Sequence, residues 1–265
     1  IPINGSFNFS TMLSRDYNNK LNTSIAFHPG SVTFGSDIWT VKPSVVTLEN
    51  KRFVIDDFAL STDNKSININ GIVSADEDDT INVSLNDVDL LEIFETLEID
   101  KALIGGTASG EFTGRAILTP TPVRYCEDLH VDNISYNRCV LGDADIVAFW
   151  DNDKRAFNLD ADVVGETGRH SRIRGDIYPE GEGLDIRFDV NHVPVGFMKP
   201  FMEAFASDLS GYASGNARLF GTFKYIDMEG DVFAEDLKIK IDFTNTWYSA
   251  SDTIRLRPGS IDIDN

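Results

Sequence analysis

The sequence has little cysteine, no excess of basic residues and no long apolar run. Its 265 residues include 23 Lys and Arg against 43 Asp and Glu, a net charge of −20. Such a chain lacks the basic surface with which proteins bind nucleic acid, and anionic membrane surfaces should repel it. It also lacks the run of about 18 apolar residues that a transmembrane helix needs. The acidity is explained by a solvated outer face.

Motifs for catalysis or metal binding are also missing. The four histidines, His28, His130, His170 and His192, are scattered, with no HExxH motif and no Cys or His pair at metal spacing. The segment DNDKRAF (151–157) begins like a calcium loop but lacks the required Gly and Glu. The sequence therefore predicts no catalytic residue, no metal ligand and no cofactor, and a protein that is not an enzyme.

The two cysteines, Cys126 and Cys139, leave two possibilities open. They form either a disulfide across neighbouring strands, in an oxidising compartment, or two buried free thiols.

What the sequence does have is an internal repeat. Gly-x-Ala-Ser-Gly occurs at 106–110 and again at 211–215, and INVSLNDV (81–88) resembles IRFDVNHV (186–193) at the same offset of 105. NGIVS (70–74) and RGDIY (174–178) match at an offset of 104, and EDLHV (127–131) and EDLKI (235–239) at 108. The matches predict a repeat of about 105 residues. The expected organisation is the end of a preceding repeat at 1–30, a first β repeat unit at 31–140, a second at 141–250 and a truncated third at 251–265.

Alternation of apolar and polar residues with period two predicts strands throughout, for example in SVTFGSDIWTV (31–41), RFVIDDFALS (52–61) and DLKIKIDF (236–243). Two segments break the alternation and predict short amphipathic helices, VDLLEIFETL (88–97) and PVGFMKPFMEAF (194–205). The expected fold is all-β and mainly antiparallel. It is an elongated, repeat-built, curled sheet with a groove, and one short amphipathic helix accompanies each repeat.

The apolar positions of the alternating strands are candidates to line that groove. An open groove and a closed hydrophobic core fit the pattern equally. The candidates are Val32, Phe34, Phe53, Ile55, Phe58, Ile67, Ile69, Ile81, Val83 and Leu85 in the first unit, and Ile186, Phe188, Val190, Ile239, Ile241 and Phe243 in the second.

The order and spacing of several longer motifs resemble the TamB envelope proteins of the AsmA-like superfamily, in the form found in Bacteroidetes-type bacteria. The motifs are IWTVKPSVVTLENKRFVIDDFALS followed by INGIVS, then ALIGGTASGEFTG, VLGDADIVAFWDNDKRAFNLDADV and GNARLFGTFKYIDMEGDVFAEDLKIKIDFTNTWYSASDTIRLRPGSIDI. The resemblance covers most of the chain.

The resemblance implies an internal periplasmic segment of a longer protein whose inner-membrane anchor lies outside this chain. It implies a β-taco groove that holds or conducts phospholipid acyl chains between the membranes and supports outer-membrane biogenesis. An outer-membrane barrel of the TamA or BamA type would be the partner, through regions outside this chain. The alternative function is a secreted acidic β-repeat adhesin or glycan-binding module. That reading expects exposed aromatic residues at loop tips, for which Trp150, Trp247 and Tyr248 are candidates.

Overall fold

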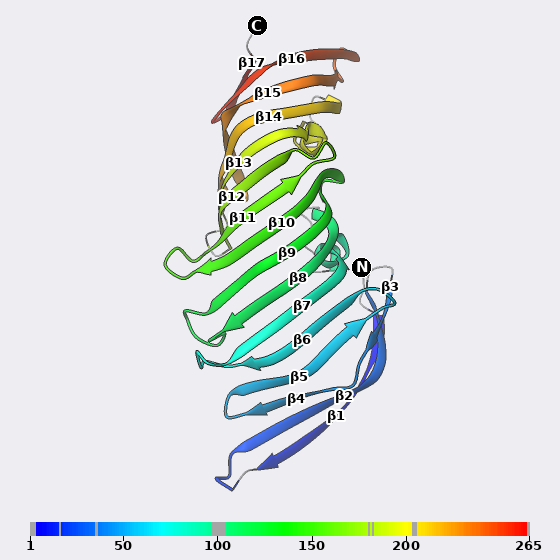
Figure 1. Cartoon of the computed structure of the whole chain (residues 1–265), viewed down its shortest axis with the longest axis vertical. Helices are drawn as coiled ribbons and strands as arrows, with labels where there is room; N and C mark the ends of the chain where they lie inside the picture. The colour runs from blue at the N-terminus through cyan, green and yellow to red at the C-terminus, as the bar shows by residue number, and fades with distance from the viewer. Residues whose placement is uncertain are drawn as a thin grey trace. The chain divides into compact units, whose positions relative to one another are not determined.

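The computed structural model describes residues 4–15, 17–34, 37–96, 104–179, 181, 183–202 and 206–263. The chain divides into two compact units: unit 1 comprises Ile1–Lys101 and Thr107–His130, and unit 2 comprises Ala102–Gly106 and Val131–Asn265. Figure 1 labels the strands that are named below. The repeat boundaries expected after residues 30, 140 and 250 fall within strands β2, β10 and β16, and stay predictions.

Almost every described element is a strand, and the strands pair antiparallel, which confirms the prediction of an all-β, antiparallel fold. Unit 1 contains β1 (Asn4–Arg15), β2 (Leu21–Phe34), β3 (Asp37–Val41), β4 (Ser44–Glu49), β5 (Arg52–Ser61), β6 (Ser66–Val73) and β7 (Thr80–Asp89). The strands β8 (Ile104–Arg115) and β9 (Val123–Tyr136) have residues in both units.

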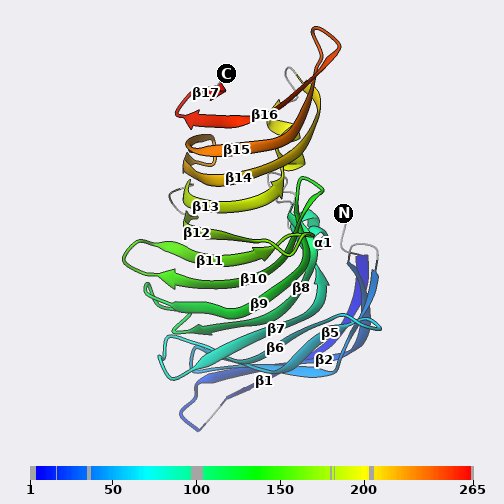
Figure 2. The ribbon, with the colours of Figure 1, turned by 45° about the horizontal axis from the view of Figure 1, so that its top comes forward.

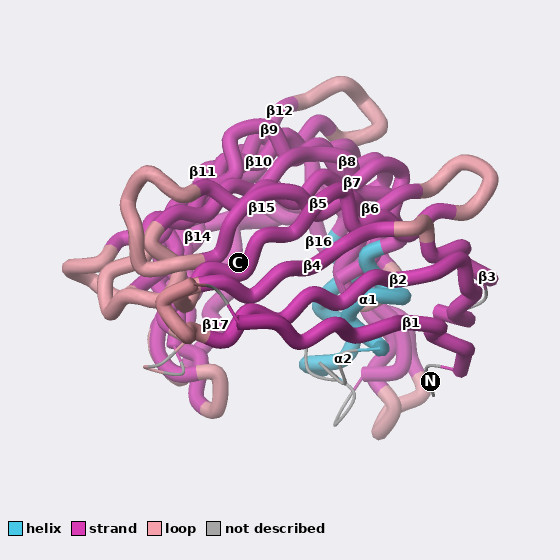
Figure 3. Tube along the Cα trace, turned by 90° about the horizontal axis from the view of Figure 1, so that it is seen from below, coloured by secondary structure: helices cyan, strands magenta, loops and turns pink. Residues whose placement is uncertain are grey.

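Unit 2 continues with β10 (Cys139–Asp151), β11 (Ala156–Val164), β12 (His170–Tyr178), β13 (Gly183–Pro194), β14 (Ala206–Thr222), β15 (Tyr225–Ile241), β16 (Thr246–Arg257) and β17 (Ser260–Ile263). From β10 to β17 each strand pairs with the next along the chain. Figure 3, in which helices are cyan, shows how little of the chain is helical.

The period-two pattern forms strands because successive side chains of a strand point to opposite faces of the sheet. In β6 the alternation is direct, with Ile67 and Ile69 half-buried and Asn68 and Asn70 exposed. One expected strand is wrong in extent: 31–41 is a hairpin in which Phe34 pairs with Asp37. The alternating stretch is therefore divided between β2, which ends at Phe34, and β3, which begins at Asp37.

The helical segments are shorter than expected. The α-helix α1 spans Leu90–Thr96, because Val88 and Asp89 still belong to β7, and the Asp89 carboxylate accepts hydrogen bonds from the N–H groups of Leu91 and Glu92. In the second segment the chain forms a 3-10 helix, η1 (Val195–Met198), and one α-helical turn, α2 (Lys199–Met202). Gly196 and Pro200 both oppose a longer helix. Of the expected helical positions, residue 97 and residues 203–205 lie outside the described residues.

Bulges recur at one residue in each of five strands. The residue has a positive φ between 47° and 58° in β5, β7, β9, β13 and β15, at Asp57, Asp87, Asn133, His192 and Asp236 respectively. In β5, β7, β13 and β15 it coincides with a register shift in the ladder. A bulge bends its strand and increases its twist, and the bulged strands β13 and β15 are bent along their length in Figure 2.

The serine of each Gly-x-Ala-Ser-Gly motif forms a hydrogen bond with the bulge residue of the neighbouring strand. The Ser109 hydroxyl oxygen accepts a hydrogen bond from the N–H of Asp87 at 3.0 Å, and Ser214 does the same for His192 at 2.8 Å. A bulge residue has no ladder partner for its N–H, so the serine satisfies a donor that the sheet cannot. The motif is therefore a structural device, in which each serine hydroxyl accepts a hydrogen bond from the backbone of a bulge.

The ladders on either side of the motif have matching registers. Val83 pairs with Phe112 as Phe188 pairs with Ala217, each residue 105 positions further on. The strand that follows the motif, β9 in the first copy and β15 in the second, is offset by 103 residues rather than by the expected 108. Gly110 lies against Leu129, since an added Cβ would be 2.8 Å from the Leu129 Cα, and the equivalent Gly215 pairs with Val232, which is 103 residues after Leu129. The bulge residues of β9 and β15 are also 103 apart. The shared triplet Glu-Asp-Leu is therefore not structurally equivalent.

Removing a bulge serine should have a small, local cost. We expect Ser214→Ala to lower the free energy of unfolding by about 1 kcal/mol, because the half-buried N–H of His192 loses its acceptor. Urea denaturation would measure the change. The control is Ser210→Ala, an exposed serine of the same strand, which should stay within about 0.5 kcal/mol of the parent. Equal effects of the two substitutions would contradict the capping role.

Candidate apolar sheet face

In unit 1 the groove candidates lie on one face of the sheet. Cross-strand pairing gathers them into rows over β5 to β8, because directly paired residues share a face. The rows are Ile55, Gly71, Ile81 and Gly114, then Phe58, Ile69, Val83 and Phe112, then Leu60, Ile67, Leu85 and Gly110. Four strands thus present one continuous apolar surface.

Unit 2 has the same arrangement over β11 to β15. Its rows are Leu159, Gly175, Ile186, Leu219 and Met228, then Ala161, Ile173, Phe188, Ala217 and Gly230. Val190, Gly215 and Val232 form a third row, and Ile239 and Ile241 extend the same face of β15 beyond its bulge.

Most of these candidates are half-buried: they are neither fully covered nor free in solvent. This holds for Ile55, Phe58, Ile67, Ile69, Ile81, Val83, Leu85, Phe188, Val190, Ile239 and Ile241. Only Val32 and Ile186 are buried as core residues are, at 5% and 6% exposure. Side chains in a closed core would be covered almost completely, whereas these positions keep some contact with solvent.

Three candidates depart from this description. Phe53 is 39% exposed although it shares the face, and Phe243 is 99% exposed because β15 ends at Ile241 and Phe243 lies in the following turn. The assignment of Phe243 to the groove was therefore wrong. Phe34 pairs with Asp37 in the ladder, but its side chain lies outside the described residues.

Sequence reasoning missed several residues of the same face. Trp39 and Val41 are 1% exposed, and Val41 pairs with Leu60, which places both on the apolar face of unit 1. The alternation of residues 31–41 includes both side chains, but the end of β2 at Phe34 and the start of β3 at Asp37 were not predicted. The other missed residues are Leu60, Phe112, Leu159, Ile173, Leu219 and Val232.

The paired rows of the apolar face consist of Ile, Val, Leu, Phe, Ala and Met side chains and glycine. Within the described part of the chain, no three His, Cys, Asp or Glu side chains are arranged to hold a metal ion. Among the described helices, none is both long and apolar enough to cross a membrane. Cys126 and Cys139 are free thiols, and burial raises the pKa of each thiol above its ordinary value, so both are poor nucleophiles.

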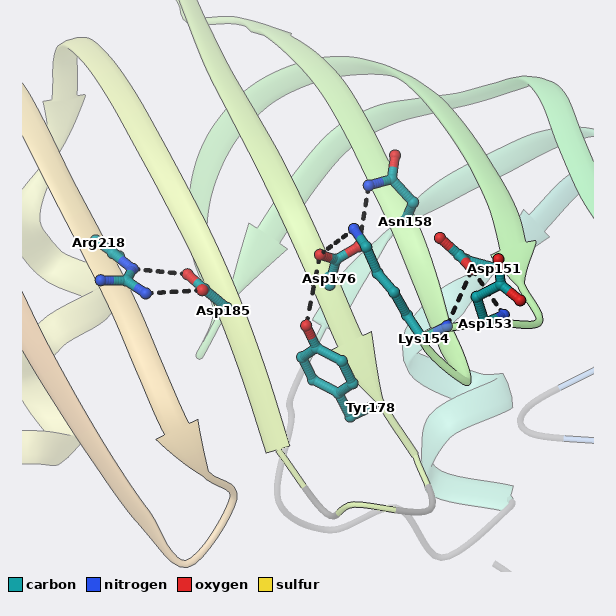
Figure 4. A network of polar contacts seen from close by, with 8 residues as sticks. All are labelled: Asp151, Asp153, Lys154, Asn158, Asp176, Tyr178, Asp185 and Arg218. Carbon is teal, nitrogen blue, oxygen red and sulfur yellow. Dashed lines mark hydrogen bonds and ion pairs between the residues drawn. The ribbon is translucent and has the colours of Figure 1, made fainter.

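The opposite face of unit 2 is polar and cross-linked by ion pairs. Figure 4 shows Arg218, from β14, whose guanidinium donates to both carboxylate oxygens of Asp185 at 2.7 and 2.8 Å. Arg218 also donates to Glu229 at 2.8 Å. These hydrogen bonds hold the pKa of Asp185 below its usual range. Lys154 pairs with Asp176 at 2.9 Å in the same network. One face of the sheet is therefore ionic and the other apolar.

Comparisons of the chain with protein-family models, with curated proteins and with solved structures found no match.

Proposed function

We propose that this chain is a periplasmic segment of a TamB-like or AsmA-like envelope protein that holds or conducts phospholipid acyl chains along its apolar sheet face. The observation that carries the proposal is the half-burial of the apolar rows over β5 to β8 and β11 to β15. A soluble protein that leaves so many paired apolar positions accessible commonly uses them to bind an apolar partner.

The energetics suit a reversible carrier. Transfer of an acyl chain from water to an apolar surface gains about 0.8 kcal/mol for each buried CH₂. Half-buried side chains cover only part of each CH₂, so the gain per carbon is smaller and no single position holds the chain firmly. A row of Ile, Val, Leu and Phe offers similar contacts at each step, which favours movement along the sheet over capture at one site.

The remaining parts of the proposal rest on the resemblance and on the matching registers. Equal pairing at Val83 and Phe188, at an offset of 105, supports a repeat-built sheet. We propose that this sheet curls into a groove and that α1 and the η1–α2 segment are the helices of successive repeats. In this proposal the inner-membrane anchor and the contact with an outer-membrane barrel lie outside this chain.

Site-specific photo-crosslinking tests the proposal. We expect benzoylphenylalanine at position 69 or 188 to crosslink phospholipid in cells that export the chain, detected by mass spectrometry after purification. The controls are position 68, which neighbours position 69 on β6, and position 231 of β15; both face the polar side, are exposed and lie outside the hollow described below. Crosslinks of equal yield on the two faces, or none on the apolar face, would overturn the proposal.

One observation favours the alternative function of a glycan-binding module. Trp247 and Tyr248, at the start of β16, are 51% and 50% exposed, and Phe243 projects from the preceding turn. Exposed aromatic rings are suited to stack on sugars. Trp150 is less suited, because it is half-buried and packs edge-to-face on Phe157. Binding of oligosaccharides that is lost in Trp247→Ala, together with absence of lipid crosslinks, would favour this reading.

A further inference from the structure

The polar face of unit 2 contains a hollow of about 450 Å³ that the lipid proposal does not use. Its lining includes Lys154, Asp160, Arg172, Arg174, Arg187 and Asp189, from β12 and β13 and the neighbouring β11 with its preceding turn. The full lining holds four cationic side chains and four carboxylates, so the hollow is formally neutral in a chain with a net charge of −20 and presents groups of both signs to a ligand.

Three arginines occupy one cross-strand row. Arg174 of β12 pairs in the ladder with Arg187 of β13, and Arg187 pairs with Arg218 of β14. Like charges placed directly opposite each other destabilise a sheet unless other groups compensate them. Arg218 is compensated, since its guanidinium binds both Asp185 and Glu229.

The other two arginines are short of acceptors. Among the described carboxylates, Arg174 approaches only that of Asp160, whose Oδ1 lies 3.6 Å away. Both oxygens of this carboxylate already accept hydrogen bonds from Arg172, at 3.0 and 2.8 Å. Among the described residues, Arg187 has neither a hydrogen bond nor an ion pair. Two neighbouring guanidinium groups therefore have donors available to a ligand.

One carboxylate of the hollow is also available. Asp176 binds Lys154 and Asn158, and Asp185 binds Arg218, but Asp189 has no hydrogen bond or ion pair with any described residue. Asp189 follows Arg187 by two positions on the same face, about 7 Å along the strand. The hollow thus offers an unpaired acceptor beside two donors that lack full partners.

We propose that this hollow binds a small zwitterion, whose oxyanion lies between Arg187 and Arg174 and whose ammonium group pairs with Asp189. A guanidinium presents parallel N–H groups that fit a phosphate or carboxylate. A ligand with one charge of each sign neutralises Arg187 and Asp189 together. A simple anion would leave Asp189 unpaired beside it and would be repelled by that carboxylate.

Calorimetric titration of the purified chain with phosphoethanolamine tests the proposal. We expect Arg187→Gln to weaken binding about tenfold or more, and Asp189→Asn to weaken binding of phosphoethanolamine but not of inorganic phosphate. The control is Arg115→Gln, an exposed arginine of β8 in unit 1, which should bind as the parent does. Because Arg187 is exposed and makes no described bond, its variant should melt at the parent temperature.

The source of the zwitterion is resolved by a second arm with vesicles containing phosphatidylethanolamine. Arg187-dependent binding of free phosphoethanolamine supports a soluble ligand, and Arg187-dependent binding of the vesicles alone supports a lipid headgroup. The proposal would be overturned if neither free phosphoethanolamine nor the vesicles bind, or if Arg187→Gln binds with the affinity of the parent. It would also be overturned if Asp189→Asn has the same effect on the binding of phosphate and of phosphoethanolamine. None of these results depends on lipid contact with the apolar face.

Discussion

Ile69→Asp is expected to abolish lipid crosslinking from neighbouring apolar positions while leaving unit 1 folded. Ile69 lies in the middle of the row formed with Phe58 and Val83 and is half-buried. Because water reaches this position, the new carboxylate can remain hydrated, so we expect a loss of about 1–2 kcal/mol, mainly the apolar contacts of isoleucine. In a dry core an unpaired carboxylate would cost several kcal/mol more, a large part of a total stability of about 5–15 kcal/mol.

The measurement pairs thermal melting by circular dichroism with crosslinking from position 83, the cross-strand neighbour. Phe188→Asp, with crosslinking from position 173, is the corresponding change in unit 2. The matched control is Asn68→Asp, which adds the same charge on the exposed face of β6. Collapse of the melting transition in Ile69→Asp would mean that the face is ordinary core. Unchanged crosslinking would mean that lipid passes elsewhere.

Gly211→Val is expected to destabilise unit 2 by about 3–5 kcal/mol. Gly211 has a φ of +118°, a conformation that a β-branched residue strongly resists. An added Cβ would also lie 2.8 Å from both the Asp236 carbonyl oxygen and the Leu237 Cα, on the bulge of β15. Neither backbone atom can move without disturbing the ladder, so strain and steric overlap add.

A turn glycine in the left-handed helical region gives a lower limit for the conformational cost. Gly168 has a φ of +72°, but an added Cβ there would meet nothing within 4 Å. Gly168→Ala should therefore cost only about 1–2 kcal/mol, the conformational penalty alone. In urea denaturation, Gly211→Ala and Gly211→Val should each lose more stability than Gly168→Ala, because the φ of +118° and the close approach to the bulge both add to the cost at Gly211. Equal losses for the two alanine variants would remove the steric part of the explanation.

The strands and their faces could be predicted from the sequence because alternation is local information. The side of the sheet on which Ile69 lies can be predicted from its neighbours in sequence, Asn68 and Asn70, without knowledge of distant contacts. The bulges could not be predicted in the same way. A bulge places two residues against one, so Leu85 and Val88 lie three apart in sequence yet face the same side. That spacing resembles helical periodicity, which explains why a helix was expected to begin at Val88.

The hydrogen bonds between polar side chains and the ends of the strands could not be predicted from local sequence, because they depend on residues that are distant in the chain. Nothing near Ser109 in the sequence indicates that its hydroxyl meets the N–H of Asp87, 22 residues away. Phe243 continues the alternation of Ile239 and Ile241, and only the turn after Ile241 removes it from the sheet. Arg187 has no bonded carboxylate because Arg172 and Arg218 already bind Asp160 and Asp185. A sequence does not show which arginine binds which carboxylate.

In unit 2, the described ladders from β10 to β17 join only consecutive strands. Such an assembly has the energetics of a one-dimensional chain, in which each hairpin contributes its own free energy and a coupling to its immediate neighbours. A destabilising substitution in one strand then lowers the stability chiefly of that strand and of the two strands beside it. Hairpins could also be gained or lost in evolution without repacking a shared interior, so the length of such a surface can be adjusted separately from the chemistry of each strand.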